Sequence, residues 1–144
     1  MNLHIFNPSH DLALASGKAD YVAPHKVKQF ESDLDFLPSL WAEDDDIVLV
    51  DNIERATRTF FDIRNKIVAL QSNNHFAVEP HFVSEKELEA VFDTNALTVC
   101  PWGWNLSLKH FLLSINKSFE KIIFDDNRLS MMRELSSRRF ASTV

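Results

Sequence analysis

The sequence predicts an α/β fold with a mostly parallel sheet of about four strands and helices on both faces. Apolar runs alternate along the chain with segments of helical spacing, which is typical of βαβ units. The run Ile47–Val50 is entirely aliphatic and shows no alternation, as expected for a strand buried on both faces of a parallel sheet. With 144 residues, the chain is long enough for one domain with its own core.

The first strand is expected over Leu3–Phe6, a short apolar run near the start of the chain. Asn7-Pro8-Ser9 ends it, because proline cannot donate a hydrogen bond to a sheet and fixes its own φ. His10 and Asp11 follow directly, before a small apolar run that predicts a helix. Such a polar turn lies at the carboxyl end of its strand, where α/β sheets bind ligands.

Polar caps and apolar spacing place the other elements. Ser84 and Glu87 have the spacing of a capping box, which predicts a helix start. Whether Lys66–Leu70 extends a helix or begins a strand stays open, so residues 66–78 contain one strand or two. Further helices are expected over residues 24–36 and after Asp51-Asn52, Ser84, Asn105 and Asp125, and further strands over Phe76–Val78, weakly, and Ala96–Cys100.

Composition excludes several classes of function. The net charge of -6 argues against a nucleic-acid backbone as partner, and no apolar run is long enough to span a membrane. Two glycines cannot supply a phosphate-binding loop, and a single Cys100 rules out an intrachain disulfide or a CxxC metal site. The cytoplasm is the default compartment.

Three polar turns follow three predicted strands: Asn7–Asp11, Asp51-Asn52 and Pro101–Asn105. Because a parallel sheet brings all its carboxyl ends to one edge, we expect these turns to converge. The tryptophans of Trp102-Gly103-Trp104 would stack on a planar ligand, pack against a second domain or cap the core, and the sequence leaves these three open.

His10 and Asp11 allow two interpretations. They would form a base with its orienting carboxylate, but adjacent side chains rarely face each other, which favours two independent groups. Alternatively, Ser9 or Asp11 caps a helix and His10 is a surface residue. No histidine has metal-ligand spacing, His4 reads as a structural histidine, and Glu43–Asp46 is expected to be a solvated acidic turn, so no metal site is predicted.

Four stretches of the sequence resemble a family. Leu3–Ala15, Ala23-Pro24-His25, Leu37–Ala42 and Pro101-Trp102-Gly103-Trp104 are similar to recurrent segments of a group of uncharacterised bacterial proteins of the Bacteroides type. Full-length members of that group resemble ATP-grasp proteins, with a Rossmann-like pre-ATP-grasp domain before the nucleotide-binding part. The resemblance implies a three-layer α/β sandwich over residues 1–124 and a helix, within 125–144, that leads towards a further C-terminal region.

For function, the resemblance implies an ATP-dependent carboxylate–amine or carboxylate–thiol ligase. This chain would supply the substrate side and would not be catalytic by itself. ATP and Mg²⁺ would be held by the C-terminal region, which would be its partner. The positions implied for substrate binding are Asn7, His10, Asp11, Trp102, Gly103, Trp104 and Asn105.

A second hypothesis belongs to another class of protein: a free-standing α/β module that binds a small molecule or a protein and catalyses nothing. The length of the natural reading frame discriminates the two. A continuation of about 100–200 residues, the usual size of a further domain, favours the ligase, whereas a stop after Val144 favours the module. The substrate and the formation of a homodimer stay open.

Overall fold

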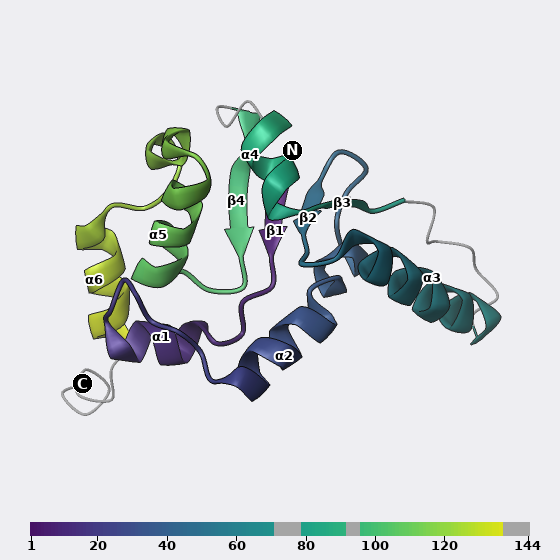
Figure 1. The fold of residues 1–144 in the computed structure, drawn as a ribbon, viewed down its shortest axis with the longest axis horizontal. Helices are drawn as coiled ribbons and strands as arrows, with labels where there is room; N and C mark the ends of the chain where they lie inside the picture. Colours follow the sequence, from purple (N-terminus) through teal and green to yellow (C-terminus); the bar gives the residue numbers. More distant parts are fainter. Residues whose placement is uncertain (71–78, 92–95, 137–144) are drawn as a thin grey trace.

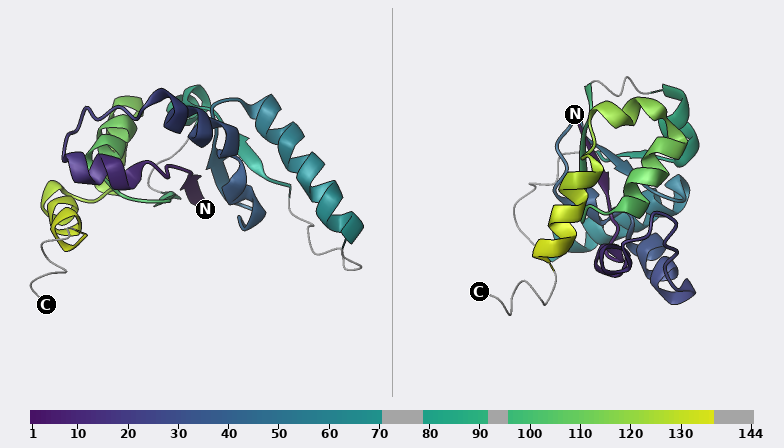
Figure 2. Two further views of the ribbon diagram at one scale, coloured as in Figure 1. Left: turned by 90° about the horizontal axis from the view of Figure 1, so that it is seen from below. Right: turned by 90° about the vertical axis from the view of Figure 1, so that its left-hand side faces the viewer.

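The computed structural model describes residues 1–70, 79–91 and 96–136, and it has a Rossmann-like three-layer α/β fold (Figures 1 and 2). The sheet contains β1 (Asn2–Ile5), β2 (Ile47–Leu49), β3 (His81–Val83) and β4 (Thr98–Pro101). All pairings are parallel, and the strand order is β3-β2-β1-β4. The predicted fold class is confirmed.

The two central strands are β1 and β2, as the two unbroken apolar runs predict. Leu3 pairs with Ile47 and Ile5 with Leu49 in a parallel register. Leu3, Ile47 and Val48 are fully buried, which shows that the sheet is covered on both faces at its centre. Two-sided burial holds for β2, where the neighbouring residues Ile47 and Val48 are both fully buried. In β1 burial alternates, with buried Leu3 and Ile5 between half-buried Asn2 and His4.

The described part of the chain contains six α-helices and two short 3-10 helices. They are α1 (His10–Ser16), α2 (His25–Leu34), η1 (Leu37–Leu40), α3 (Ile53–Leu70), α4 (Glu85–Val91), α5 (Leu106–Ile115), η3 (Lys117–Lys121) and α6 (Asp126–Leu135). Leu88 of α4 and Leu112 of α5 pack with Leu3 on one face of the sheet. Phe60 of α3 packs with Val48 on the other. α3 and α6 lie at opposite ends of the molecule in Figures 1 and 2.

Side-chain caps begin the helices where the sequence predicts them. Asn52 Oδ1 accepts from Arg55 N at 2.8 Å. Ser84 and Glu87 form the expected capping box, in which Glu87 Oε2 accepts from Ser84 N at 2.8 Å. Asn105 and Asp125 begin α5 and α6 in the same way, accepting from Leu108 N and Arg128 N.

Three sequence-based expectations need correction or completion. Lys66–Leu70 continues α3, which settles one open question. The third strand is His81–Val83, a segment too short and too close to Pro80 to stand out in the sequence, whereas Phe76–Val78 lies outside the described residues. The helix expected over residues 24–36 ends at Leu34 and buries none of its residues fully.

Asp46 anchors the start of β1. The expectation of a solvated acidic turn holds for the exposed residues Glu43, Asp44 and Asp45 but not for Asp46, which is buried. Its side chain is 3% exposed and accepts hydrogen bonds from Asn2 N at 2.7 Å and Glu43 N at 3.1 Å. His4 Nε2 lies 3.0 Å from Asp46 Oδ2, which confirms His4 as a structural histidine. Burial alone would raise the pKa of Asp46, but these hydrogen bonds outweigh it and hold the pKa well below its usual range.

The last helix docks against the first. Leu129 is buried, and Arg133 of α6 donates to the carbonyl oxygen of Ala15 at 3.2 Å. Gly17 ends α1 with a left-handed φ of 63°, and the Arg133 guanidinium occupies the space where a side chain at that position would lie. None of the helices in the described ranges combines the length and the apolar character that a membrane span requires.

A charge placed at Val48 is expected to prevent folding. Val48 is 0% exposed and packs in the part of the core that contains Phe36 and Phe60. Val48→Asp therefore buries an unpaired carboxylate there. The expected loss exceeds about 4 kcal/mol of unfolding free energy, measured by urea denaturation or seen as insoluble protein. Val22→Asp, at a position 67% exposed, is the control. A soluble Val48→Asp protein with unchanged thermal stability would contradict the assignment of a central strand.

Replacing Asp46 should reveal a pH-dependent contribution to stability. Asp46→Asn removes the negative charge that strengthens the hydrogen bonds of this side chain with Asn2 N and His4 Nε2. The loss should lower the free energy of unfolding by about 2 kcal/mol at pH 7. Because the pKa of Asp46 in the folded protein lies below its ordinary value of 3.8, this stabilisation is present above about pH 4 and is lost as the pH falls further. Urea denaturation of both proteins from pH 7 to pH 3 should show the difference shrinking, and a difference independent of pH would refute this role.

Candidate functional site

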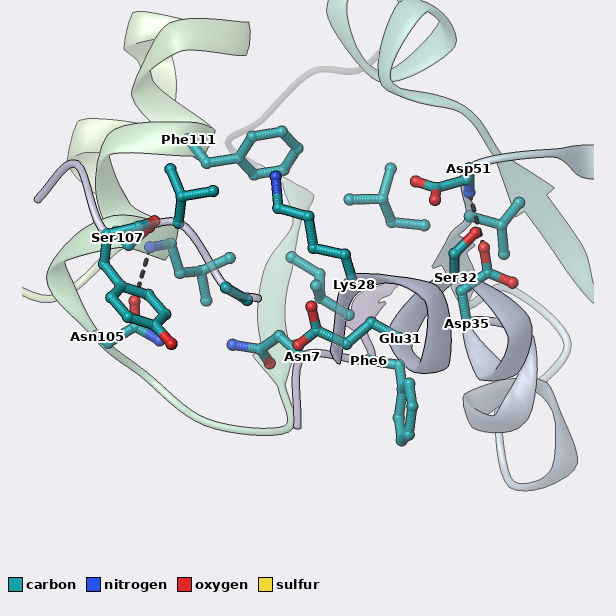
Figure 3. A pocket seen from close by; sticks show the side chains of 17 residues that line it. Phe6, Asn7, Lys28, Glu31, Ser32, Asp35, Asp51, Asn105, Ser107 and Phe111 are labelled. Atoms are coloured by element: carbon teal, nitrogen blue, oxygen red, sulfur yellow. Dashed lines mark hydrogen bonds between the residues drawn. The ribbon is translucent and has the colours of Figure 1, made fainter. Parts of the chain in front are cut away.

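A cavity of about 490 Å³ opens at the carboxyl edge of the sheet (Figure 3). It lies where β1 and β2 end, between α2 and the beginning of α5. Apolar side chains supply much of its lining: Ile5, Phe6, Val22, Ala23, Leu49, Val50, Leu108 and Phe111. In a sheet of this topology, ligands bind at this edge, close to the point where the strand order reverses between β1 and β4.

Helix α2 presents a polar stripe to the cavity. Lys28, Glu31, Ser32 and Asp35 recur at positions i, i+3, i+4 and i+7, and all four line it. Glu31 Oε1 accepts from Ser9 N at 2.9 Å, which ties α2 to the turn after β1. The side chain of the exposed Lys28 has no ion-pair or hydrogen-bond partner among the described residues.

Asp35 joins the end of α2 to the end of β2. Its Oδ2 accepts from Asp51 N at 2.8 Å and from Arg55 Nη2 at 3.0 Å, while Arg55 also donates to the Ser32 carbonyl oxygen. Its Oδ1 is buried and has no partner in the described part of the chain. Burial raises the pKa of Asp35, against the opposing effects of the Asp51 N–H and the Arg55 charge.

Asn7 and Gly103 join the turns after β1 and β4. Asn7 Nδ2 donates to the Gly103 carbonyl oxygen at 2.7 Å, and Asn7 Oδ1 accepts from Gly103 N at 3.2 Å. The pairing of β1 with β4 continues into this contact, because Trp102 N donates to the Ile5 carbonyl oxygen at 2.8 Å. The expected convergence of these two polar turns is therefore observed.

His10 lies against Gly103 and faces its neighbour Asp11. A Cβ at Gly103 would overlap the His10 imidazole, so the glycine leaves the space that the ring fills. His10 Nε2 is 3.1 Å from Asp11 Oδ1, and the expectation that adjacent side chains act independently is wrong here. Ser9 is at the N-cap position of α1 but its side chain makes no cap hydrogen bond, and the side chain of His10 is 22% exposed, so that it lies partly at the surface.

The tryptophans of the turn after β4 lie in different environments. Trp102 is 56% exposed and packs edge-on against Phe6, with ring centroids 5.5 Å apart, and Phe6 also meets Phe30. Trp104 packs on Phe124 at 4.8 Å, at the margin of the core under α5. Capping the core therefore describes Trp104, whereas Trp102 presents an aromatic surface to solvent.

The seven predicted site residues are only partly gathered at the cavity. Asn7 and Asn105 line it, with Asn105 buried as the cap of α5. His10, Asp11, Trp102 and Gly103 form a neighbouring cluster outside the lining, and Trp104 points to the core. Sequence reasoning missed the polar stripe of α2, although its helical spacing was readable, and it noted Asp51 without assigning it to a site.

The chemistry available here is recognition by hydrogen bonds and charge. The described ranges contain no group of three or more His, Cys, Asp or Glu side chains placed to hold a metal ion. Burial, aided by the charge of Asp46, raises the pKa of the Cys100 thiol, which lowers the fraction of reactive thiolate. The polar groups of the cavity are suited to bind and orient a small molecule.

The contact between Gly103 and His10 can be tested by a double-mutant cycle. Gly103→Ala should cost about 1–3 kcal/mol, because the new methyl group overlaps the imidazole. In a His10→Ala background the same change should cost much less, giving a coupling energy of at least about 1 kcal/mol in urea denaturation. Asp11→Asn, at a side chain 83% exposed, should leave stability nearly unchanged. Additive effects of the two alanine substitutions would contradict the packing.

Comparison of the chain with protein-family models, with curated proteins and with solved structures finds no match in any of the three. The candidate site is therefore defined by geometry: a cavity at the carboxyl edge of a parallel sheet, with polar groups from α2, β2 and α5 around an apolar floor.

Proposed function

We propose that this chain binds a small polar molecule in the cavity and serves as the N-terminal, substrate-side domain of an ATP-dependent carboxylate–amine or carboxylate–thiol ligase. The observation that carries the proposal is the cavity itself. Its volume of about 490 Å³ falls within the range of about 300–1,000 Å³ typical of small-molecule sites. It also lies at the sheet edge where related topologies bind ligands.

The lining suits a ligand that is partly apolar. Ile5, Leu49 and Phe111 offer surface that can remove hydrocarbon from water, which provides affinity. Polar groups from separate segments surround this surface, including Asn7 after β1 and Asp51 after β2. Groups fixed on different elements can orient a substrate, which is the task of a substrate-side domain.

The ligase part of the proposal is supported by the resemblance of the Leu3–Ala15 and Pro101–Trp104 stretches to Bacteroides-type ATP-grasp proteins. In such an enzyme, ATP activates a carboxylate as an acyl phosphate, which an amine or thiol then attacks. ATP and Mg²⁺ belong to the further C-terminal region in this proposal, and the residues described here bind and orient the substrate.

Blocking the cavity should abolish binding. Ala23 lines the cavity from the loop before α2, and Ala23→Trp should fill part of it. In ligand-observed NMR with a fragment library, the wild-type chain should bind several small fragments that the variant does not bind. Asp20→Trp, exposed in the same loop and outside the lining, is the matched control. The proposal fails if no fragment binds, or if both variants bind the same fragments equally.

The chain alone is expected not to hydrolyse ATP. It contains no glycine-rich phosphate-binding motif, and the proposal assigns nucleotide binding to another region. Purified protein incubated with ATP and Mg²⁺ should release no phosphate above the buffer control. Turnover that survives repeated purification, and that a point mutation in the cavity such as Asp51→Asn removes, would overturn this division of labour.

A further inference from the structure

We infer that the ligand of the cavity is a protonated primary amine on an apolar body, so that this domain receives the amine reactant and not the carboxylate. The inference rests on the proposed function and deepens it by naming the substrate class. It follows from how charge is distributed along the cavity wall.

One end of the cavity is acidic and the other is neutral. In Figure 3, Ser32, Asp35 and Asp51 gather at one end, and Asn105 and Ser107 lie at the opposite end. The acidic end combines two carboxylates with a hydroxyl, which together can accept the three hydrogen bonds of an ammonium group. Arg55, which does not line the cavity, pairs with Asp35 from outside, whereas Asp51 forms no ion pair with a cation among the described residues.

The acceptors at the acidic end are available. Asp51 uses its backbone N–H in the contact with Asp35, and its carboxylate forms no ion pair with any described residue. Asp35 Oδ1 is a buried acceptor without a partner, on a residue that is 6% exposed. A buried acceptor left unsatisfied costs free energy, which a bound donor would recover after a small rearrangement of the side chain.

Lys28 sets the balance of charge. The lining holds the carboxylates of Glu31, Asp35 and Asp51 against the single ammonium of Lys28, and Arg55 compensates Asp35. The remaining charge is negative, and the chain as a whole carries -6. Lys28 is exposed on a flexible stem and can turn to solvent, which leaves the carboxylates of Asp51 and Glu31 to favour a cation over a carboxylate.

The neutral end determines the rest of the ligand. Phe111 and Leu108 line it together with Asn105 and Ser107, but the side-chain oxygen of Asn105 is occupied by its cap and the Ser107 hydroxyl donates to Tyr21. These two oxygens are therefore already engaged, and an uncharged apolar body fits this end better than a second charge.

Two probes of the same shape test the inference. 2-Phenylethylamine and 3-phenylpropanoate share a ring and a two-carbon chain, and they carry opposite charges. In ligand-observed NMR titrations at pH 7 and low salt, the amine should bind about tenfold tighter, as expected for about 1.4 kcal/mol of charge discrimination. The Ala23→Trp protein should bind neither probe.

The two charge variants of the lining should differ in their effect on amine binding. Asp51→Asn should weaken amine binding about fivefold, in line with about 1 kcal/mol for a partly exposed charge contact, and Lys28→Met should leave it unchanged or strengthen it. The controls are Asp33→Asn and Lys26→Met, which change the same charges on α2 outside the lining and should have no effect.

The amine inference is overturned if the carboxylate probe binds tighter, if Lys28→Met weakens amine binding, or if neither probe binds while neutral fragments occupy the cavity. In each of these cases the cavity remains a small-molecule site, so the proposed function survives. Absence of all fragment binding in the earlier experiment would instead remove the proposed function itself.

Discussion

The bidentate contact between Asn7 and Gly103 is the constraint on which the functional edge depends. One side-chain amide satisfies both the N–H and the carbonyl oxygen of a backbone position 96 residues away. This fixes the turn after β1 against the turn after β4, and Asn105 begins α5 two residues later. The position of α5, and with it the neutral end of the cavity, therefore follows from this contact. Gly103 is needed there because the His10 ring fills the space of a side chain.

Two buried aspartates lie at the two ends of β2, and their carboxylates differ in how completely they are hydrogen-bonded. Asp46, just before β2, has both oxygens hydrogen-bonded and a lowered pKa, so it stabilises the entry of the chain into the sheet. Asp35 contacts the end of β2, keeps one oxygen without a partner and has a raised pKa. The Asp35 oxygen without a partner leaves an acceptor for a bound molecule at the carboxyl edge. The fully hydrogen-bonded Asp46 carboxylate serves the stability of the sheet at the amino edge.

The sequence was sufficient for the parallel sheet and its central strands. Two-sided burial removes alternation from Ile47–Val50, whereas Leu3–Phe6 stood out by its apolar residues although burial alternates along β1. Helix caps were also readable, since Ser84 and Asn105 act on backbone groups three residues away. β3 was not, because three residues carry too little pattern and its neighbours in space are distant in sequence. The site was half predictable: strand ends point to Asn7 and Asn105. The polar stripe of α2 could not be assigned to the site from the sequence, because only tertiary packing decides that this face lines the cavity and not the solvent.

The central claim is that ligands bind in the cavity and not on the aromatic surface beside it. An NMR titration of ¹⁵N-labelled protein with the tightest-binding fragment tests this directly, since backbone amides and tryptophan indoles report on both places. The account predicts the largest shifts at Ser32, Asp51 and Ser107 around the cavity, with the Trp102 indole little changed. Shifts concentrated on the Trp102 indole and on His10, with the cavity amides unmoved, would contradict it.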